Sequence, residues 1–325
     1  MKTIFFGSED FSLPSFDVLH RGPHQVVAVI TQPDRKKGRG MKEMPTPIAQ
    51  RASILNIPLY KPEKLRAQDF LELLTSLAPD LVVVCAYGRF LNKTLLACPV
   101  KGCINVHPSL LPRYRGAMPI ESAIMAGDTM TGVSIFYMDE GCDTGDIIVQ
   151  REFPIEESDT RGTLREKLSH FAAEVLAGAL ELIDQGRAPR IRQQSGITEC
   201  THCIEKDDTF IDWAQGPQQV RNFTRALWPR PSAQTMFRGR LLKVGPLAIT
   251  SSTEGKDAQP GTIVELRKNE GPVIKVEEGY VQLTDITPEG KKCMTAKEFC
   301  LGYSPKRGEE FHGRKPDEGH TKEDI

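Results

Sequence analysis

LVVVCAYG, residues 81–88, and CINVH, residues 103–107, are short runs with hardly any polar side chains, and they decide the fold. Strands that are buried on both faces of a parallel sheet have this composition. KTIFFG at residues 2–7 and QVVAVITQ at residues 25–32 are runs of the same kind. We therefore expect four strands in the interior of one parallel sheet.

Amphipathic segments of helical length lie between these runs. The period of their apolar residues predicts helices over Phe11–His20, Pro47–Leu55 and Asp69–Leu77. Repeated strand–helix alternation is typical of α/β domains with a doubly wound, mostly parallel, Rossmann-like sheet. Ligands of such sheets bind beyond the carboxyl ends of the strands.

The first domain continues with two more strands and a long helix. GVSIFYMDEG at residues 132–141 and DIIVQREFPI at residues 146–155 are the strand candidates. The helix is expected from Thr160 to Asp184, with Gly186 as its stop signal. One face of that helix is apolar and carries Leu164, Leu168, Phe171, Val175 and Leu176. We place the first domain at residues 1–189.

A change of composition marks a second domain. Residues 190–204 are polar and irregular, as in a linker. Residues 205–304 hold short alternating strand runs separated by Gly and Pro, which favour a small antiparallel barrel of the OB-like kind. Residues 305–325 are charged and rich in Gly and Pro, and we expect this tail to be disordered.

Composition excludes several classes of protein. The chain of 325 residues has a formal net charge of −1, so nucleic acid must be bound by a local basic patch. No apolar run reaches the roughly 18 residues of a membrane span, and no signal segment precedes the first strand, so we expect a cytoplasmic protein and no membrane partner. The pair Cys200 and Cys203 has C-x-x-C spacing but no second half-site, and we expect no metal.

The polar residues Asn105 and His107 interrupt the apolar strand at residues 103–107. Side chains two residues apart share one face of a strand, and Pro108 ends the strand at its carboxyl edge. Asp143, between Gly141 and Gly145, lies in a loop after another strand candidate. The alternative is that Asn105 and His107 are core residues satisfied by backbone and that Asp143 is a turn residue.

An amide, an imidazole and a carboxylate together fit acyl transfer without a protein nucleophile. Asn105 and His107 can donate hydrogen bonds to the oxyanion that forms when an amine attacks a carbonyl carbon. Asp143 can orient His107 and help to take the proton from the amine. No Ser or Cys is paired with His107 in the sequence, so we expect no acyl-enzyme.

The stretches CINVHPSLLPRYRGAMPI and GVSIFYMDEGCDTGDII resemble the signature of the folate-dependent formyltransferases. In that family an Asn-x-His-x-Ser-Leu-Leu-Pro motif and a downstream Asp move a formyl group from 10-formyltetrahydrofolate to an amine. The resemblance implies that Asn105, His107 and Asp143 are catalytic. It implies folate contacts at Ser109, Leu110, Leu111, Pro112, Tyr87, Gly88 and Gly141. The chain has Pro108 where the family usually has Gly, which indicates a stiffer loop.

The rest of the chain narrows the choice of acceptor. TQPDRKKGRGMKEMPTP, residues 31–47, is similar to the basic insertion of the methionyl-tRNA formyltransferase branch, and its cations are Arg35, Lys36, Lys37, Arg39 and Lys42. IEKDDTFIDW, PGTIVEL and GKKCMTAKEFCLG resemble the carboxyl-terminal domain of that branch. The resemblance implies initiator methionyl-tRNA as partner, in translation initiation, and we take a monomer as the expected state. Phe11 is a candidate wall for the methionine side chain.

Three other functions compete with this interpretation. A folate-dependent formyltransferase for amino-sugar nucleotides would share the first domain but needs no basic insertion. A dinucleotide-binding oxidoreductase would need a G-x-G-x-x-G fingerprint, which GSEDF at residues 7–11 lacks. A non-catalytic RNA-binding protein would bind tRNA whether or not Asn105, His107 and Asp143 were intact.

Overall fold

The computed structural model describes residues 1–37, 42–194 and 200–313. Contacts divide the chain into two compact units. The first unit comprises residues 1–120, 129–155 and 164–202, and the second comprises residues 121–128, 156–163 and the chain from 203 onward. Two short segments from the first half of the chain therefore group with the second unit.

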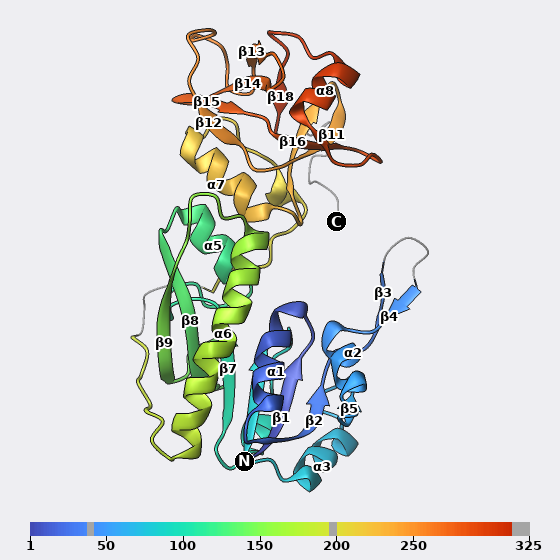
Figure 1. The fold of residues 1–325 in the computed structure, drawn as a ribbon, viewed down its shortest axis with the longest axis vertical. Helices are drawn as coiled ribbons and strands as arrows, with labels where there is room; N and C mark the ends of the chain where they lie inside the picture. The colour runs from blue at the N-terminus through green and yellow to red at the C-terminus, as the bar shows by residue number, and fades with distance from the viewer. Residues whose placement is uncertain (38–41, 195–199, 314–325) are drawn as a thin grey trace, which may run out of the picture. The chain divides into compact units, whose positions relative to one another are not determined.

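The first unit is built on a seven-stranded sheet of order β5-β2-β1-β6-β7-β8-β9 (Figure 1). The strands, in that order, are Leu59–Tyr60, Gln25–Ile30, Lys2–Gly7, Leu81–Cys85, Cys103–His107, Met130–Tyr137 and Ile147–Pro154. The pairs from β5 to β7 are parallel, whereas β8 is antiparallel to both β7 and β9. The predicted mostly parallel sheet is confirmed.

Helices cover both faces of this sheet. The helices of the first unit are α1 (Leu13–Arg21, preceded by the 3₁₀ turn η1, Asp10–Ser12), α2 (Pro47–Ile54), α3 (Gln68–Leu77), α4 (Lys93–Leu96) and most of α6 (Arg161–Asp184). Most of α5 (Pro119–Ala126) lies in residues 121–128, which group with the second unit. Phe5 of β1 contacts Phe16 of α1, with ring centroids 5.1 Å apart. Its neighbours Ile4 and Phe6 join the cluster of α3 instead. Strand β1 is thus buried on both sides, as its apolar sequence requires.

The long helix α6 forms where the apolar pattern predicts it. Leu164, Leu168, Val175 and Leu176 are buried. Helix α4 is absent from the sequence prediction because its four residues are too short to show a helical period.

The basic segment forms a small hairpin. Strand β3 (Arg35–Lys37) pairs antiparallel with β4 (Lys42–Met44). The Arg35 guanidinium donates to Gln32 Oε1 at 2.7 Å. Arg39 lies outside the described residues, as do Gly38 and Gly40.

The described residues from 203 onward form two antiparallel sheets and two helices, and the predicted antiparallel domain is confirmed. The five-stranded sheet holds β17 (Met294–Thr295), β16 (Asp285–Pro288), β11 (Arg240–Val244), β10 (Ala233–Phe237) and β18 (Phe311–His312). The four-stranded sheet holds β12 (Ala248–Thr250), β15 (Gly279–Gln282), β14 (Gly271–Val276) and β13 (Ile263–Arg267). Helices α7 (Pro217–Leu227) and α8 (Ala296–Tyr303), with the 3₁₀ turn η2 (Asp207–Thr209), accompany the two sheets.

The expected disorder after residue 304 is wrong for residues 305–313. Strand β18 pairs with β10, and Phe311 is buried. Its ring lies 4.7 Å from that of Phe237 and 6.0 Å from that of Trp213. One aromatic side chain anchors a segment that is otherwise charged. Residues 314–325 lie outside the described residues.

The expected linker at residues 190–204 is in large part attached to the first unit. Ile191 forms a bridge with Ile147, and Thr201 forms one with Gly116. Gln193 is buried. The stretch between these contacts, residues 195–199, is not among the described residues. Composition does not reveal this attachment, because the attachment depends on polar side chains that form hydrogen bonds within the fold.

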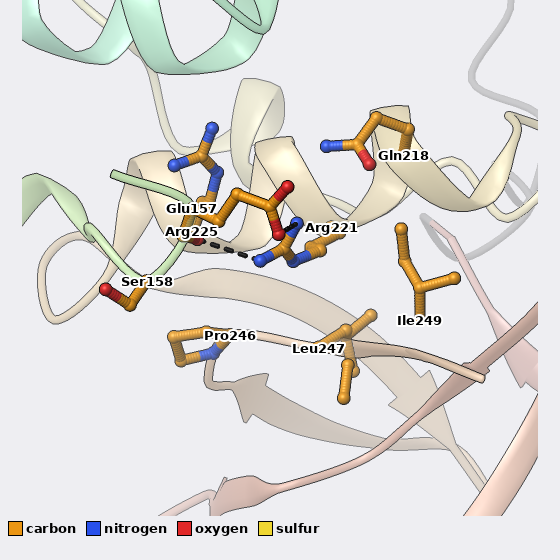
Figure 2. A pocket seen from close by; sticks show the side chains of 9 residues that line it. Glu157, Ser158, Gln218, Arg221, Arg225, Pro246, Leu247 and Ile249 are labelled. Atoms are coloured by element: carbon orange, nitrogen blue, oxygen red, sulfur yellow. Dashed lines mark hydrogen bonds and ion pairs between the residues drawn. The ribbon is translucent and has the colours of Figure 1, made fainter. Parts of the chain in front are cut away.

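A cavity of about 520 Å³ lies in the second unit (Figure 2). Its cations already have internal partners: Arg221 donates to the Glu157 carbonyl at 2.8 Å, and Arg225 donates to the Asp159 carbonyl at 3.0 Å. Burial lowers the pKa of Arg225, so the guanidinium depends on those carbonyls. We therefore assign this cavity a structural role. Within the described part of the chain, no helix has the length and apolar character needed to cross a bilayer.

Candidate active site at the end of strand β7

Strand β7 carries Asn105 and His107 to the carboxyl end of the parallel sheet. The imidazole of His107 is buried and meets Phe136 edge-on, with ring centroids 6.4 Å apart. Asn105 is half-buried, and among the described residues its side-chain amide has no hydrogen-bond partner. An unpaired, half-buried amide at this edge is available to a ligand.

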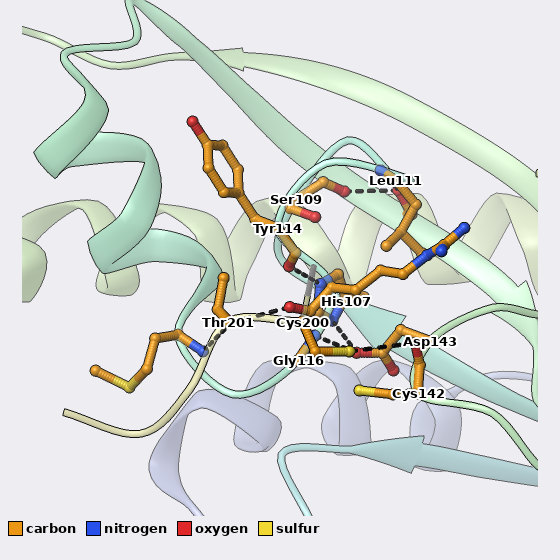
Figure 3. Close-up of polar contacts among 12 residues, drawn as sticks. His107, Ser109, Leu111, Tyr114, Gly116, Cys142, Asp143, Cys200 and Thr201 are labelled. Carbon is orange, nitrogen blue, oxygen red and sulfur yellow. Dashed lines mark hydrogen bonds and ion pairs between the residues drawn. The ribbon is translucent and has the colours of Figure 1, made fainter. Parts of the chain in front are cut away.

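Asp143 lies in the loop between β8 and β9 and reaches His107. Its Oδ2 is 3.6 Å from His107 Nδ1 and accepts a hydrogen bond of 2.8 Å from the Gly116 amide (Figure 3). The backbone of Asp143 is left-handed, with φ +54°, a conformation that Asp tolerates better than most residues. The structure therefore brings together two of the three predicted catalytic side chains, with Asn105 two residues away on β7.

The second nitrogen of His107 is also engaged. Nε2 lies 2.9 Å from the carbonyl oxygen of Tyr114. Since a carbonyl can only accept, Nε2 carries the hydrogen and donates it. The Tyr114 carbonyl therefore occupies the N–H that His107 would use to bind an oxyanion.

The predicted folate loop, residues 109–112, is held firmly by its backbone and by Ser134 and Gln150. Ser109 is fully buried, and its hydroxyl donates to the Arg113 carbonyl at 2.7 Å. Ser134 Oγ accepts from the Leu111 amide at 3.1 Å and donates to the Ser109 carbonyl at 2.6 Å. Gln150 donates to the Leu111 carbonyl at 2.8 Å. The hydroxyl of Ser109 is thus committed inside the protein, and Leu111 is buried.

Leu110 and Pro112 are the partly exposed members of this loop. Of the glycines predicted to contact folate, Gly88 has φ +75° at the end of β6, and Gly141 is closely approached by Thr144. A Cβ on Gly141 would lie 2.0 Å from Thr144 Oγ1. The two glycines are required by the local backbone and packing, whatever their contact with a ligand.

Two predicted aromatic contacts are buried. The Tyr87 ring packs edge-on against Phe6 at 5.1 Å, and 1% of Tyr87 is exposed, so its side chain belongs to the core and not to a folate surface. Burial raises the pKa of Tyr87 to about 12. Phe11 is 4% exposed and is covered by the guanidinium of Arg165, 5.4 Å from the ring centre. In this form of the protein Phe11 does not offer a ring face to a methionine side chain.

The sequence did not predict a further group of residues that supports the site from behind Arg115 and Gly116. Gln193 and Thr201 come from the expected linker, and they bind Arg115 and Gly116 beside His107. Gly116 has φ +98°, and a Cβ there would lie 2.6 Å from the Thr201 carbonyl oxygen. Gln193 and Thr201 lie in an irregular segment without periodicity, so the sequence does not predict their contacts. The only sequence signal for these contacts is Gly116, the glycine that follows Arg115.

Two thiols lie close to the site. Cys200 Sγ is 3.9 Å from the Cys142 carbonyl, and Cys142 precedes Asp143. Burial, then the contact with Cys200, raises the pKa of Cys142 to about 12. A thiol of that kind is a poor nucleophile at neutral pH. Within the described residues no three His, Cys, Asp or Glu side chains cluster as metal ligands do.

Family models match most of the chain. Residues 1–180 match the model described as formyl transferase, and residues 203–304 match the model described as the C-terminal domain of formyl transferase. The chain belongs to the formyl transferase family, and it is an enzyme of the transferase class.

Its relatives narrow the family to one branch. A methionyl-tRNA formyltransferase of Halothermothrix orenii is 39% identical over 315 residues, which cover 96% of this chain and 100% of the relative. A methionyl-tRNA formyltransferase of Pelotomaculum thermopropionicum is 40% identical over 302 residues, covering 93% and 96%.

Solved structures share the architecture. HypX from Aquifex aeolicus in complex with tetrahydrofolic acid has a TM-score of 0.65 at 17% identity, over 95% of this chain and 48% of that chain. WlaRD, a sugar 3N-formyl transferase, has a TM-score of 0.64 at 16% identity, over 90% and 99%. At such identities the likeness shows the fold alone.

Proposed function

We propose that this enzyme transfers the formyl group of 10-formyltetrahydrofolate to the α-amino group of methionyl initiator tRNA, by direct attack of the amine. The observation that carries the proposal is the contact of Asp143 with His107 beside the unpaired amide of Asn105, at the carboxyl end of β7. The near-full-length relatives named methionyl-tRNA formyltransferase support this choice of acceptor.

The residues around β7 fit a folate donor. An amide without an internal partner suits a ligand that carries a carbonyl, and the formyl group carries one. The loop of residues 109–112 is fixed by Ser134 and Gln150, so it offers a rigid surface on which Leu110 and Pro112 are partly exposed. We assign the pterin contact to this loop, with Gly88 and Gly141 as close-approach positions.

The chemical step needs an oxyanion donor and a proton route. The amine nitrogen attacks the formyl carbon, the bond from that carbon to folate N10 breaks, and N10 takes the proton that the amine loses. The Asn105 amide donates to the formyl oxygen as negative charge develops. His107 supplies a second N–H once the formyl oxygen displaces the Tyr114 carbonyl from Nε2, and Asp143, 3.6 Å from Nδ1, orients the ring.

The acceptor needs little activation. An ordinary α-amine has a pKa of about 7.7 to 8.0, and the neighbouring ester lowers it, so much of the nucleophile is neutral near pH 7. Positioning and oxyanion stabilisation then supply most of the rate. We assign the tRNA backbone to the basic segment of residues 31–47, whose cations Arg35, Lys36, Lys37, Arg39 and Lys42 can bind phosphates.

The test is to incubate the protein with 10-formyltetrahydrofolate and methionyl initiator tRNA and to measure formyl-methionyl-tRNA. Free methionine, uncharged tRNA and an amino-sugar nucleotide are the comparison acceptors. Formylation of the charged tRNA alone, weakening as salt rises, is the expected result. Transfer to the sugar nucleotide in preference to the charged tRNA would overturn the proposal. Binding of tRNA with no formyl transfer would favour a non-catalytic protein.

A further inference from the structure

Gln193 is a buried amide in the stretch that follows α6. It is 8% exposed, and both polar atoms of its side chain have partners. The side-chain NH₂ donates to the Asp143 carbonyl at 2.9 Å and to the Gly145 carbonyl at 2.8 Å. Its Oε1 accepts from Arg115 Nε at 3.1 Å and from Nη2 at 2.8 Å. One side chain therefore joins two loops that are distant in sequence.

The first of these loops holds the carboxylate. Asp143 has a left-handed backbone, which costs free energy unless other contacts fix it. The two bonds from Gln193 fix the carbonyls on both sides of Thr144. Gly145 allows this close path, because a Cβ there would lie 1.7 Å from the Tyr137 carbonyl oxygen.

The second loop holds the carbonyl that binds His107 and the amide that binds Asp143. Arg115 lies between Tyr114, whose carbonyl meets His107 Nε2, and Gly116, whose amide donates to Asp143 Oδ2. The backbone of Arg115 is bound by Thr201, whose amide and hydroxyl donate to the Arg115 carbonyl at 2.7 and 2.9 Å. Gln193 binds the Arg115 guanidinium, so it ties this loop to the loop of Asp143.

We propose that Gln193 is a positioning residue for formyl transfer: by bridging Arg115 to the backbone of Asp143 and Gly145, it fixes the carboxylate of Asp143 against His107. The inference rests on the proposed function for its kinetic test. Gln193 itself acts through Asp143 and is not required to touch either substrate.

The kinetic test compares Gln193→Met and Gln193→Glu with wild type. Met removes both donors and the acceptor at similar length, and Glu keeps acceptor oxygens toward Arg115 but removes both donors. Both variants are expected to lose about 10- to 100-fold in kcat with KM for each substrate changed less, because misplacement of a catalytic group slows the chemical step. Gln185→Met, an exposed glutamine just after α6, is the matched control and should keep wild-type kcat.

A double-mutant cycle separates positioning from general destabilisation. If Gln193 acts through Asp143, Gln193→Met should cost little more in an Asp143→Asn background, whereas its cost should persist in full beside Asn105→Ala. Wild-type kcat in Gln193→Met, an effect on KM alone, or an equal loss in the Asp143→Asn background would each overturn the inference.

A measurement without turnover keeps this result distinct from failure of the proposed function. In protein labelled with ¹⁵N-histidine, the ring signals of His107 should shift in Gln193→Met while those of His20 stay in place. Unchanged His107 signals would overturn the role of Gln193. If wild type transfers no formyl group to charged tRNA, the proposed function fails and the histidine signals still decide the role of Gln193.

Discussion

At the scale of single residues, two side chains of the candidate site differ in whether they have hydrogen-bond partners within the protein. Nε2 of His107 donates to the Tyr114 carbonyl and Nδ1 faces the Asp143 carboxylate at 3.6 Å, whereas Asn105 has no hydrogen-bond partner among the described residues. The contrast assigns different tasks: the imidazole is held in one orientation, and the amide is the donor available to an incoming carbonyl.

Asn105→Ala should lower kcat by about 10² to 10³-fold, because it removes an oxyanion donor. The free energy of unfolding should change little, since the amide bonds to no described residue. Single-turnover formylation of methionyl-tRNA measures the first effect and thermal unfolding the second. A near-normal kcat in a folded variant would contradict the mechanism.

Cys142→Ala should keep most of the wild-type activity. The pKa of this thiol is raised to about 12 by burial and Cys200, so at pH 7 to 8 it is protonated and cannot serve as a nucleophile. Site-resolved mass spectrometry should find its alkylation slow at pH 8 and still accelerating above pH 10. A large loss of kcat in Cys142→Ala, or an acyl group trapped on Cys142, would show that an acyl-enzyme forms after all.

The placing of the three candidate residues at one edge of the sheet could be predicted because each has a sequence context: an interrupted apolar strand, a proline stop and a glycine-flanked aspartate. The partner of His107 Nε2 could not, because Tyr114 contributes only a backbone carbonyl. The burial of the Tyr87 ring could not be predicted, because an aromatic residue at a strand end has the same pattern whether it faces a ligand or the core.

At the scale of elements, the short segment from Tyr114 to Met118 contacts both His107 on β7 and Asp143 in the loop after β8. Thr201 lies alongside it, and the Met118 amide donates to Thr201 Oγ1 at 2.9 Å. Gly116 sits at the closest approach, with φ +98° and Thr201 backbone atoms at 2.6 and 3.0 Å from a Cβ position. A side chain at residue 116 would push the two segments apart.

Gly116→Ala should therefore lower both the free energy of unfolding, by more than about 1 kcal/mol, and kcat. Gly186→Ala is the matched control: Gly186 has φ +67° but nothing within 4 Å of a Cβ position. That control should cost about 1 kcal/mol in stability and nothing in kcat. Equal effects of the two substitutions on kcat would argue against a tight contact at Gly116.

Elements with an unbroken apolar run, such as β1 and β6, or with a strong helical period, such as α6, could be predicted from sequence. Segment 305–313 could not, because the single buried ring of Phe311 is outweighed in composition by its charged neighbours. The attachment of residues 191–194 and 200–202 was missed for a related reason: its hydrogen bonds come from isolated polar side chains.

At the scale of the whole molecule, stability should fall at alkaline pH. Burial raises the pKa of Cys85, Cys103 and Tyr87 to about 12 in the folded protein. The unfolded chain releases these protons at its ordinary pKa values of 9.0 for Cys and 10.0 for Tyr. Their contribution is fully present below about pH 9 and is lost as pH rises toward 12.

Tyr87→Phe isolates part of this effect. The Tyr87 hydroxyl is buried with no partner among the described residues, so its removal should change the free energy of unfolding by less than about 1 kcal/mol at pH 7. Above pH 10 the variant should become progressively more stable than wild type. Urea unfolding from pH 7 to 12 measures the difference, and parallel curves for the two proteins would contradict the prediction.

The contacts of Gln193 and Thr201 also matter when the gene is shortened to obtain a catalytic fragment. A cut after residue 189 would discard Gln193 and Thr201, and with them the hydrogen bonds that brace the Asp143 loop and Gly116. Ending the fragment at residue 202 keeps both braces. Even then, residues 121–128 and 156–163 would be severed from the unit with which they group.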